Sequence, residues 1–473
     1  MPQPVTHINA EHLERIRAWY DEHPDSLGWG TVGYRAILAH YYGLLIPTEA
    51  SVLEIGCGTG ELLRRLNAKR KVGIDLSEKQ LDAARYHCPE GEFHLQSGEA
   101  LHLEERFDVI IVSDTLNQAA DVQLLLERLH AVSHPGTRLI VNYPSALWRP
   151  AFGIASALGM KPSAPQSNWL TTADVRGLME LADWIPIVTQ PRILWPVDAM
   201  GIGTFLNRWL APIFTWLCLT VFCVARSSRL RPNAPLTVSV VVPARNEAGN
   251  IEAAVRRTPN MGAGTELIFV EGHSRDNTWE EIQRVQRVYP DRRIKVLQQT
   301  GRGKGDAVRA GFAVAEGDLF MILDADLTVP PEEMTKFYDA VASGRAEFAN
   351  GSRLVYPMEK AAIRFLNMCA NKTFGFLFTW ILGQPLKDTL CGTKVLRRAD
   401  WDRIVANREF FGDFDPFGDF DMLFGAARLN MKIMDVPVRY RDRTYGSTNI
   451  HRWSHGWLLL RMVVFAARKI KFV

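Results

Sequence analysis

Two aspartates, Asp324 and Asp326, closely follow the apolar run LFMI and are separated by one residue. Side chains two positions apart point to the same side of an extended chain, so we expect both carboxylates on one face. Carboxylate oxygens are hard ligands that suit Mg²⁺ or Mn²⁺. A cation held there would bridge a diphosphate and neutralise the charge that builds on a leaving group. We therefore predict a divalent-metal site, although an isolated D-x-D pair is more often a solvated surface pair.

Glycines and cations that suit phosphate occur in the same half of the chain. The loop GRGKGDAVRAG starts at Gly301 and carries Arg302 and Lys304 ahead of a helical pattern. Its backbone N–H groups and cations could hold phosphates or a nucleoside. Because a guanidinium donates hydrogen bonds to phosphate in pairs, we include three further arginines as candidate phosphate ligands: Arg353, Arg364 and Arg443.

The first half contains a different glycine-rich turn. The string EIGCGTG begins at Glu54 and includes Gly56, Gly58 and Gly60, which permit a sharp turn and a close approach to a ligand. Asp75 ends the next apolar run, where an acid could accept hydrogen bonds from both ribose hydroxyls of an adenosine. The spacing G-x-G-x-G differs from the G-x-G-x-x-G of dinucleotide-binding domains. The alternative is a tight turn with a solvated strand end.

Alternating strands and helices must position these residues. In the first half, SVLEIGC, KVGIDL, FDVIIVS and RLIVNY read as strands, and QLDAARYH and VQLLLERLHAV as helices. This alternation predicts a parallel sheet. The later runs IPIVTQPRIL and LCLTVFCVA add two strands.

The second half repeats the alternation. LTVSVVVPA, ELIFVEG, IKVLQQ and LFMILDAD read as strands, and NIEAAVRR, TWEEIQRVQRVY and KGDAVRAGFAVA as helices. The polar, proline-containing seam RSSRLRPNAP suits a linker. We predict an α/β protein with two Rossmann-like domains: residues 1–226, a linker at 227–235, and residues 236–473 ending in an amphipathic helix.

Composition limits the remaining possibilities. The 473 residues are 47% hydrophobic and 23% charged, which is typical of a globular chain of two or three domains. The net charge of +3 gives no support for nucleic acid as a partner. Six scattered cysteines without a C-x-x-C pair suit a reducing cytoplasm, and the polar N-terminus argues against secretion.

Two apolar segments require a membrane test. The run WLAPIFTWLCLTVFCVA is short for a spanning helix and rich in β-branched and aromatic residues, so we favour a buried strand. The end, HRWSHGWLLLRMVVFAARKIKFV, suits an interfacial helix on anionic lipid, and FGFLFTWIL could be a second docking face. The alternative is that both are core helices. We predict a cytoplasmic protein that is peripheral on the inner face of the membrane.

The first half resembles class I S-adenosylmethionine (SAM)-dependent methyltransferases. The matching strings are EIGCGTG with the acid at 75, GEAL, FDVIIVSDTLN and HPGTRLIV, followed by two runs that look like the closing strand pair. The resemblance implies SAM as cofactor, bound at Glu54, the three glycines and Asp75, with Glu99 meeting the adenine amine. Asp114 and Asn117 would face the methyl acceptor, although a loop-capping role is equally compatible. The acceptor is not identified.

The second half resembles family-2 GT-A glycosyltransferases of the dolichol- or polyprenol-phosphate mannosyl- and glucosyltransferase type. The matching strings include VVVPARNEAGNI, GRGKGDAVRAGF, LDADL, NGSRL, KDTLCGTKVLRR and FGDFDML. The resemblance implies a nucleotide-sugar donor whose base is lined by Pro243, Arg245 and Glu247. Asp324 would contact the nucleotide through the metal and Asp326 would bind the metal directly. The three arginines would hold donor and acceptor phosphates.

One string departs from that family. Where its members usually read V-D-D-G-S, this chain reads V-E-G-H-S. Glu271 can replace the first acid and Asp276 keeps the following one, but the acid that usually contacts the base is missing. The nucleotide of the donor therefore stays open.

The acceptor can be argued from charge. A phosphate monoester is mostly dianionic at neutral pH and can attack an anomeric carbon without a general base, whereas a hydroxyl needs one. Asp419 and Asp421 are the candidate bases, or else an acid pair at a helix N-terminus. The arginines favour a polyprenyl phosphate.

Three functional hypotheses follow. The first is a bifunctional enzyme that transfers a sugar and a methyl group. The second is a glycosyltransferase acting on a glycan or other hydroxyl, with the first half as a SAM-binding regulatory module. The third, a sugar-phosphate nucleotidylyltransferase, expects a glycine-rich, basic signature at the first strand, where this chain reads PARNE.

Overall fold

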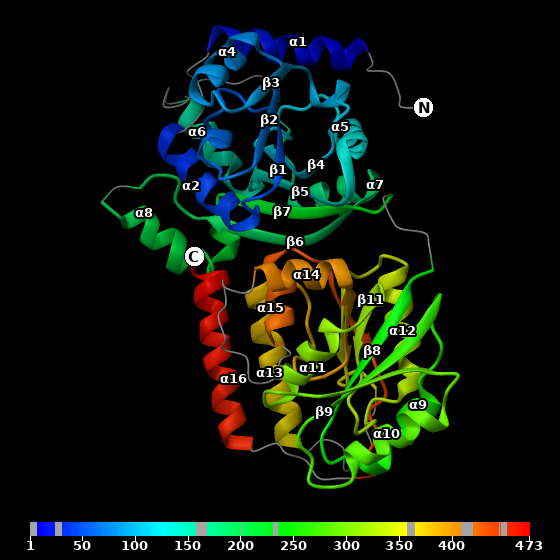
Figure 1. Ribbon diagram of the computed structural model, residues 1–473. Coiled ribbons are helices and arrows are strands. Elements are labelled where there is room, and N and C mark those ends of the chain that lie inside the picture. The colour runs from blue at the N-terminus through cyan, green and yellow to red at the C-terminus, as the bar shows by residue number, and fades with distance from the viewer. Residues whose placement is uncertain are drawn as a thin grey trace. The chain divides into compact units, whose positions relative to one another are not determined.

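The chain forms two compact units in the computed structural model, Met1–Arg231 with Phe472–Val473, and Pro232–Lys471 (Figure 1). The structure describes residues 7–23, 31–157, 168–198, 200–229, 235–356, 365–407, 420–443, 445 and 452–473.

The first unit is built on a seven-stranded sheet in the order β3-β2-β1-β4-β5-β7-β6. The first five of these strands pair in parallel, and β7 runs antiparallel to both β5 and β6. The parallel sheet and the closing strand pair are therefore confirmed. The strands are β1 (Ser51–Ile55), β2 (Arg70–Asp75), β3 (Glu92–Leu95), β4 (Phe107–Ser113), β5 (Ser133–Pro144), β6 (Trp184–Ile193) and β7 (Thr220–Ser227).

Both faces of this sheet are covered. Along β4, Ile110 and Val112 join one hydrophobic core while Val109 and Ile111 join the core on the other face, as the two-residue period of a strand requires. The helices that supply the covering layers and the edges are α1 (His7–Glu22), α2 (Thr31–Leu45), α3 (Glu61–Arg65), α4 (Glu78–His87), α5 (Val122–Arg128), α6 (Arg149–Ala157), α7 (Thr172–Leu181) and α8 (Ile202–Phe205).

The apolar run at residues 209–225 ends in a strand, as expected. Its last part belongs to β7, which is buried at every position and hydrogen-bonded on both sides. No helix in the described part of the chain combines the length and the apolar character needed to cross a bilayer.

The second unit has its own seven-stranded sheet, in the order β10-β9-β8-β11-β13-β12-β14. Four neighbouring strands, from β10 to β11, are parallel, and β13 runs antiparallel to β11 and β12. The strands are β8 (Thr237–Ala244), β9 (Gly264–Glu271), β10 (Arg293–Gln298), β11 (Leu319–Ile322), β12 (Phe348–Ser352), β13 (Lys394–Arg397) and β14 (Ile433–Pro437).

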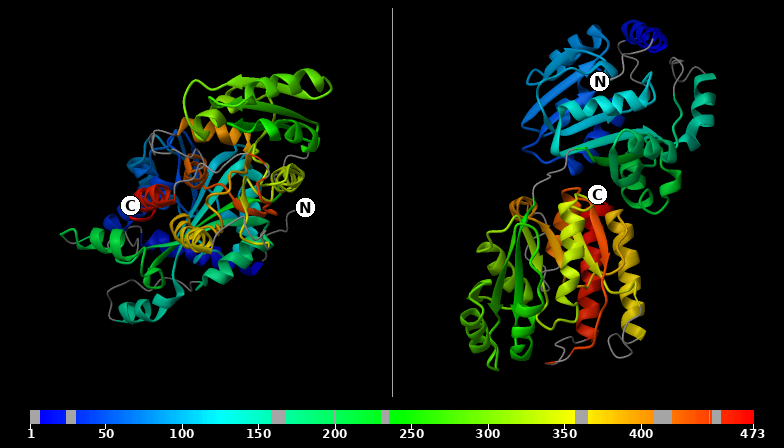
Figure 2. Two further views of the ribbon diagram at one scale, coloured as in Figure 1. Left: turned by 90° about the horizontal axis from the view of Figure 1, so that it is seen from below. Right: turned by 90° about the vertical axis from the view of Figure 1, so that its right-hand side faces the viewer.

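Helices of the second unit follow most of these strands. Figure 1 and Figure 2 show α13 beside α16, and these two helices contact each other. The two α/β sheets confirm the predicted fold class. The helices are α9 (Ala248–Arg257), α10 (Thr278–Val288), α11 (Lys304–Ala313), α12 (Met334–Ala342), α13 (Phe365–Leu382), α14 (Arg398–Ala406), α15 (Phe420–Arg428) and α16 (Arg452–Ala466).

Candidate active sites

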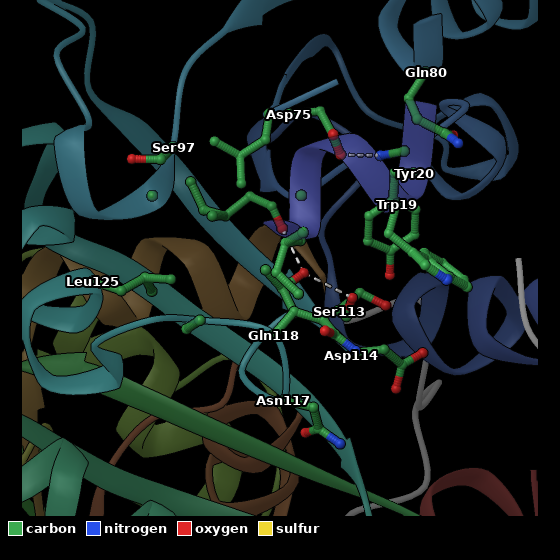
Figure 3. Close-up of a pocket in the computed structure, with 18 of the residues that line it drawn as sticks. Trp19, Tyr20, Asp75, Gln80, Ser97, Ser113, Asp114, Asn117, Gln118 and Leu125 are labelled. Carbon is green, nitrogen blue, oxygen red and sulfur yellow. Dashed lines mark hydrogen bonds between the residues drawn. The ribbon is translucent and has the colours of Figure 1, made fainter. Parts of the chain in front are cut away.

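A cavity of about 250 Å³ lies at the carboxyl edge of the first sheet. The loops that follow β1, β2 and β4 line it because parallel strands end at a common edge. Figure 3 shows Trp19 and Tyr20 of α1 on the opposite side of the cavity from Ser97 and Leu125. A cavity of this size, enclosed by both loops and helices, suits a small-molecule cofactor.

The glycine-rich turn has the backbone geometry that its sequence predicted. Gly56, Gly58 and Gly60 have φ values of 70°, 52° and 71°, in the left-handed region that favours glycine. A Cβ on Gly56 would lie 2.6 Å from Oγ1 of Thr115. Gly56 and Gly58 line the cavity, whereas Gly60 precedes α3 as its N-cap.

Asp75 is fixed at the end of β2 by backbone donors. Its carboxylate accepts a hydrogen bond from the N–H of Gly58 at 2.8 Å (Figure 3) and another from the N–H of Ser77 at 3.0 Å. Burial raises the pKa of Asp75, and these N–H groups oppose that rise. The side chain lines the cavity, where a ribose could donate to it.

Glu54 takes a different position from the one that the resemblance implied. Its side chain is 1% exposed and it is not among the described residues that line the cavity. Burial raises the pKa of Glu54 to about 8, and the charge of Arg35 opposes the rise. Glu54 therefore lies beneath the cofactor turn, and its position does not support direct contact with a cofactor.

Glu99 lines the cavity but already has a backbone partner. Its Oε1 accepts a hydrogen bond from the N–H of Ala120 at 2.9 Å, and burial raises its pKa. Contact with an adenine amine would use its remaining acceptor capacity.

Asp114 belongs to a buried polar network on the acceptor side. It has a φ of 54°, and its Oδ1 accepts from Nδ2 of Asn142 at 2.7 Å. Oδ1 of Asn142 accepts in turn from the hydroxyl of Tyr42 at 2.6 Å, and Nη1 of Arg35 lies 3.9 Å from Asp114. Asp114 and Asn117 both line the cavity. Asp114 therefore lines the cavity while internal partners hold it, and its role towards a methyl acceptor stays a prediction.

Several lining residues were not predicted from the sequence. Tyr20 and Tyr34 reach the cavity from α1 and α2, and Phe152 and Trp169 contribute from after β5. Burial raises the pKa of Tyr20 to about 12, so its hydroxyl stays a donor at neutral pH. The only sequence signal for these residues was a set of aromatics in a polar region.

The second site also lies at a carboxyl edge, after β8 to β11. Lys304, the first residue of α11, places its Nζ 2.6 Å from Oδ1 of Asp324. Burial opposes ionisation of Asp324, but the charge and hydrogen bond of Lys304, with the charges of Lys394 and Arg353, lower the pKa of this carboxyl. Asp324 is therefore held as a carboxylate next to Lys304, a cation from the predicted phosphate-binding loop.

The segment that carries the two aspartates is a turn and not an extended strand. β11 ends at Ile322, and the N–H of Leu327 donates to the carbonyl of Asp324 at 3.1 Å. The expectation that strand period alone aligns Asp324 and Asp326 is therefore wrong. Both side chains follow the same strand end, but different partners hold them.

Arg443 links Asp326 to the loop after β8. Its Nη2 lies 2.6 Å from Oδ2 of Asp326 and its Nη1 lies 3.1 Å from Oε1 of Glu247. Burial raises the pKa of Glu247 and Arg443 opposes the rise. A single guanidinium thus joins two predicted donor-site acids that are distant in the sequence.

The other residues that were predicted to lie near the nucleotide base differ in their burial and in their partners. Glu271 is 3% exposed and accepts from the N–H of Ser274, so it shapes the loop after β9. Asp276 accepts from the hydroxyl of Tyr445 at 3.3 Å. Pro243 is partly buried within β8, and Arg245 is exposed in the loop that follows.

Arg353 has an internal partner. Its Nε and Nη2 lie 2.7 and 2.9 Å from the carboxylate of Asp388, which is fully buried. Burial opposes the charge on Asp388, but Arg353 lowers its pKa. Asp388 therefore occupies the paired donors of Arg353, and the phosphate-binding role of Arg353 stays a prediction. The string KDTLCGTKVLRR contains Asp388, but the sequence alone indicates no role for it.

Gly392 is a second residue of that string with an unpredicted role. A Cβ on Gly392 would overlap Nζ of Lys304 and the carboxylate of Asp324. Any side chain at this position would therefore require the ion pair between Lys304 and Asp324 to shift.

Among the described residues, no group of three or more His, Cys, Asp or Glu side chains is placed to hold a metal. Asp324 and Asp326 supply hard oxygen ligands, so phosphate oxygens would complete the coordination. Asp421 lies in the first turn of α15 and lines a separate cavity of about 230 Å³ with Trp401 and Ile404. Asp419 and Arg364 lie outside the described residues.

Curated proteins match parts of this chain. A dolichol-phosphate mannosyltransferase of Pyrococcus furiosus is 39% identical over 224 residues, covering 46% of this chain and 59% of that protein. An undecaprenyl-phosphate 4-deoxy-4-formamido-L-arabinose transferase of Pseudomonas aeruginosa is 30% identical over 222 residues, covering 45% of this chain and 59% of that protein. The chain spans less than two thirds of the length of these relatives.

Solved structures also align with each half. A SAM-dependent methyltransferase of Thermotoga maritima, described as a possible histamine N-methyltransferase, is 20% identical, covers 46% of this chain and 99% of that one, and has a TM-score of 0.34. A glucosyl-3-phosphoglycerate synthase of Mycobacterium tuberculosis, crystallised with Mn²⁺ and UDP, is 18% identical, covers 50% of this chain and 80% of that one, and has a TM-score of 0.36.

Family models match the two halves separately. Residues 47–172 match the model described as "Methyltransferase domain", and residues 239–404 match "Glycosyl transferase family 2". These matches agree with the two strand orders and with the two separate sites. Both resemblances inferred from the motifs are thus confirmed, and the chain joins a methyltransferase domain to a family-2 glycosyltransferase domain.

Proposed function

We propose that the second unit transfers a sugar from a nucleotide-sugar to a polyprenyl phosphate or related acceptor and that the first unit transfers a methyl group from SAM to an acceptor that the sequence does not identify. The observation that carries the sugar-transfer proposal is the pairing of both strand-end acids with cations. Lys304 holds Asp324, and Arg443 holds Asp326. Carboxylates with adjacent cations suit a metal-diphosphate group, since each charge gains an opposite partner when that group binds.

The donor site would work mainly by positioning and charge. Asp324 and Asp326 would hold Mg²⁺ or Mn²⁺, which would supply Lewis-acid stabilisation of the leaving diphosphate. Lys304 and Arg443 would turn from the carboxylates towards phosphate oxygens. Glu247 and Asp276 would stay with the loop beside the nucleoside. The reaction would be a single displacement that inverts the anomeric carbon.

The relatives' names support a lipid phosphate as the acceptor. One acts on dolichol phosphate and another on undecaprenyl phosphate, as their names state. A dianionic phosphate can attack without a base. Asp421, whose cavity has Arg428 on its lining, would then have a positioning role towards the acceptor.

The methyl-transfer proposal rests on the enclosed cavity of the first unit. Asp75 would accept from the ribose of SAM, and the turn of Gly56 and Gly58 would approach the amino-acid part closely. Because the sulfonium is already activated, the protein must mainly align the acceptor with the methyl carbon. Asp114 and Asn117 lie where they could orient that acceptor.

Peripheral membrane contact of the second unit belongs to the same proposal. Trp457 on α16 is 63% exposed and Phe376 on α13 is 73% exposed, and these two helices contact each other. Arg468 and Lys469 follow on the surface. Exposed aromatic residues next to cations are typical of helices that lie on anionic lipid. A cytoplasmic site on the inner membrane face stays a prediction.

The test is incubation of the full chain with radiolabelled nucleotide-sugars, polyprenyl phosphate in detergent, and Mn²⁺. We expect label in the organic phase, and we expect a chelator to abolish it. Hydrolysis of the donor without a lipid product would contradict the acceptor, and transfer that survives the chelator would contradict the metal.

A regulatory role for the first unit is the alternative. Glu99 and Asp114 accept internal hydrogen bonds, so neither is an uncommitted base. SAM binding that alters sugar transfer, with no methyl transfer to any lipid, sugar or protein fraction, would favour this alternative.

A further inference from the structure

The segment between β6 and β7 has the reverse of the usual amphipathic arrangement. Gly203, Asn207 and Ala211, spaced four apart, are buried against the first unit. Large apolar side chains of the same segment face outward, with exposed fractions of 55% for Ile202 and 57% for Phe205. In a surface helix of a globular unit the large apolar residues normally face inward.

Exposed large apolar side chains occur along most of the segment between β6 and β7. We call residues 195–217 the apolar ridge. Figure 1 shows α8, one of the short helices of the ridge, at one side of the unit. The exposed large side chains of the ridge are Trp195, Val197, Met200, Ile202, Phe205, Trp209, Ile213, Phe214 and Trp216.

The ridge is held in this orientation by specific contacts. The Oδ1 of Asn207 accepts from the N–H groups of Leu194 and Trp195, both at 2.8 Å, and its Nδ2 donates to the carbonyl of Trp195 at 2.8 Å. A Cβ on Gly203 would overlap the carbonyl of Val197. The outward direction of the large residues is therefore built into the fold and does not result from a loosely packed loop.

The ridge is continuous along the chain with the methyltransferase cavity. Pro196, within the ridge, lines that cavity, and so does Leu219, which lies two residues after the end of the ridge. Phe152 and Trp169 line the same cavity, with ring centroids 5.6 Å apart. Apolar surface thus leads from the outside of the unit to the place where the methyl acceptor must bind.

We propose that the apolar ridge docks the first unit on a lipid bilayer and that the methyl acceptor is an amphiphile drawn from that bilayer. Tryptophans at 195 and 216, next to aliphatic side chains, suit the boundary between headgroups and acyl chains. Arg208 is exposed on the same segment and would favour anionic headgroups. This inference rests on the proposed function, because it identifies the acceptor class of the proposed methyl transfer.

Docking can be tested at one position on the ridge. Cys369 is the exposed cysteine of the chain, so Ile213→Cys in a Cys369→Ser background gives one accessible attachment point for an environment-sensitive fluorophore. Leu181→Cys, at the end of α7 on the other side of the unit in Figure 1, is the matched control with 65% exposure against 58% for Ile213. The probe is a vesicle of phosphatidylcholine and phosphatidylglycerol.

We expect a blue shift and increased emission on vesicle addition from the label at 213 and no change from the label at 181. A label at 213 that does not respond to vesicles overturns the docking proposal. So does a response that appears without vesicles and grows with protein concentration, because it shows a second copy on the ridge.

The substrate class has its own test. With methyl-labelled SAM and the lipid-linked product made by the second unit, we expect label in the organic phase. Ile213→Ser with Phe214→Ser should reduce that label at least about tenfold, because each buried apolar side chain contributes roughly a factor of ten to partitioning. Leu181→Ser should leave it unchanged.

Two controls separate this inference from the proposed function. SAM binding should be unchanged in the double serine variant, and so should sugar transfer to polyprenyl phosphate in detergent. Methyl label confined to water-soluble acceptors overturns the amphiphile while leaving methyl transfer intact. Absence of methyl transfer despite SAM binding refutes the proposed function of the first unit and the inference with it.

Discussion

The two units use the same edge of a similar sheet but hold their acids differently. In the first unit, backbone N–H groups hold Asp75 and Glu99. In the second unit, charged side chains hold Asp324 and Asp326. The difference corresponds to the ligands expected at each site. A ribose is neutral and needs a rigid acceptor, whereas a metal-diphosphate brings charges that must exchange partners.

This comparison shows that the strand edge determines where a site lies, while the partners of its acids determine which ligand it suits. Backbone donors cannot leave Asp75 when a ligand binds. Lysine and arginine side chains have several rotatable bonds and can turn from carboxylate to phosphate. Substitutions in one unit should therefore leave the other unit's ligand binding intact.

The largest expected effect is at Asp326. Asp326→Asn removes the charge that would hold the metal and should reduce sugar transfer about 100- to 1000-fold. SAM binding, measured by calorimetry on the same sample, should not change. Loss of both would contradict two independent sites, and retention of full sugar transfer would remove Asp326 from the metal site.

The buried ion pair of the second unit should dominate its stability. Asp388→Asn leaves Arg353 without a charged partner in a buried position and should lower the free energy of unfolding by about 3–5 kcal/mol. Denaturant unfolding of the second unit measures this change. The control is Glu332→Gln, which breaks a partly exposed pair with Arg257 and should cost less than about 1 kcal/mol. Equal effects from the two substitutions would contradict the role of burial.

The effect at Asp75 should be smaller and confined to the first unit. Asp75→Asn weakens two charge-assisted hydrogen bonds to a ribose, so SAM affinity should fall about 10- to 100-fold. Titration with SAM measures the change, and sugar transfer in detergent is the control. Unaltered affinity would place the adenosine elsewhere in the cavity.

The smallest effect concerns Glu54 and pH. The pKa of Glu54 in the folded chain is about 8, above its ordinary value of 4.5, so the folded state binds the proton more tightly than the unfolded state. The stabilisation is present below pH 4.5 and is lost as pH rises towards about 8, with a slope of at most about 1.4 kcal/mol per pH unit.

Glu54→Gln should remove this slope for the first unit, and chemical unfolding at several pH values measures it. Asp108→Asn is the control: the pKa of Asp108 is lowered from 3.8, so its contribution is lost only as pH falls below that value, and the slope between pH 4.5 and 8 should remain. Stability of the first unit that rises with pH across this range in the wild-type chain would contradict a buried, protonated Glu54.

Much of each fold could be predicted because buried strands are recognisable in the sequence as short apolar runs. The runs that form β1, β2, β4 and β5 are apolar on both faces, and the hydrophobic cores on the two faces of the first sheet bury them. β3 was missed because its sequence, EFHL, buries only Phe93 and has no apolar run. β7 was separable from a spanning helix because β-branched and aromatic residues fill it.

The sites were less predictable because they depend on distant partners. The motifs located Asp75, Asp324 and Asp326, but no local pattern shows that Arg443 bridges to Glu247. Likewise, the position of Glu54 beneath the turn follows from tertiary burial, which the motif string does not contain. For residues 195–217, the sequence shows that the segment is apolar but does not show that its large side chains face outward.

The bridge by Arg443 also has a consequence for biosynthesis. Asp326 precedes Arg443 by 117 positions, whereas the last described lining residue of the methyltransferase cavity is Leu219. Domains generally fold in order as the ribosome releases them. The described residues that line the cavity of the first unit are therefore all synthesised before Arg443, so this cavity can begin to form while Asp326 still lacks its partner.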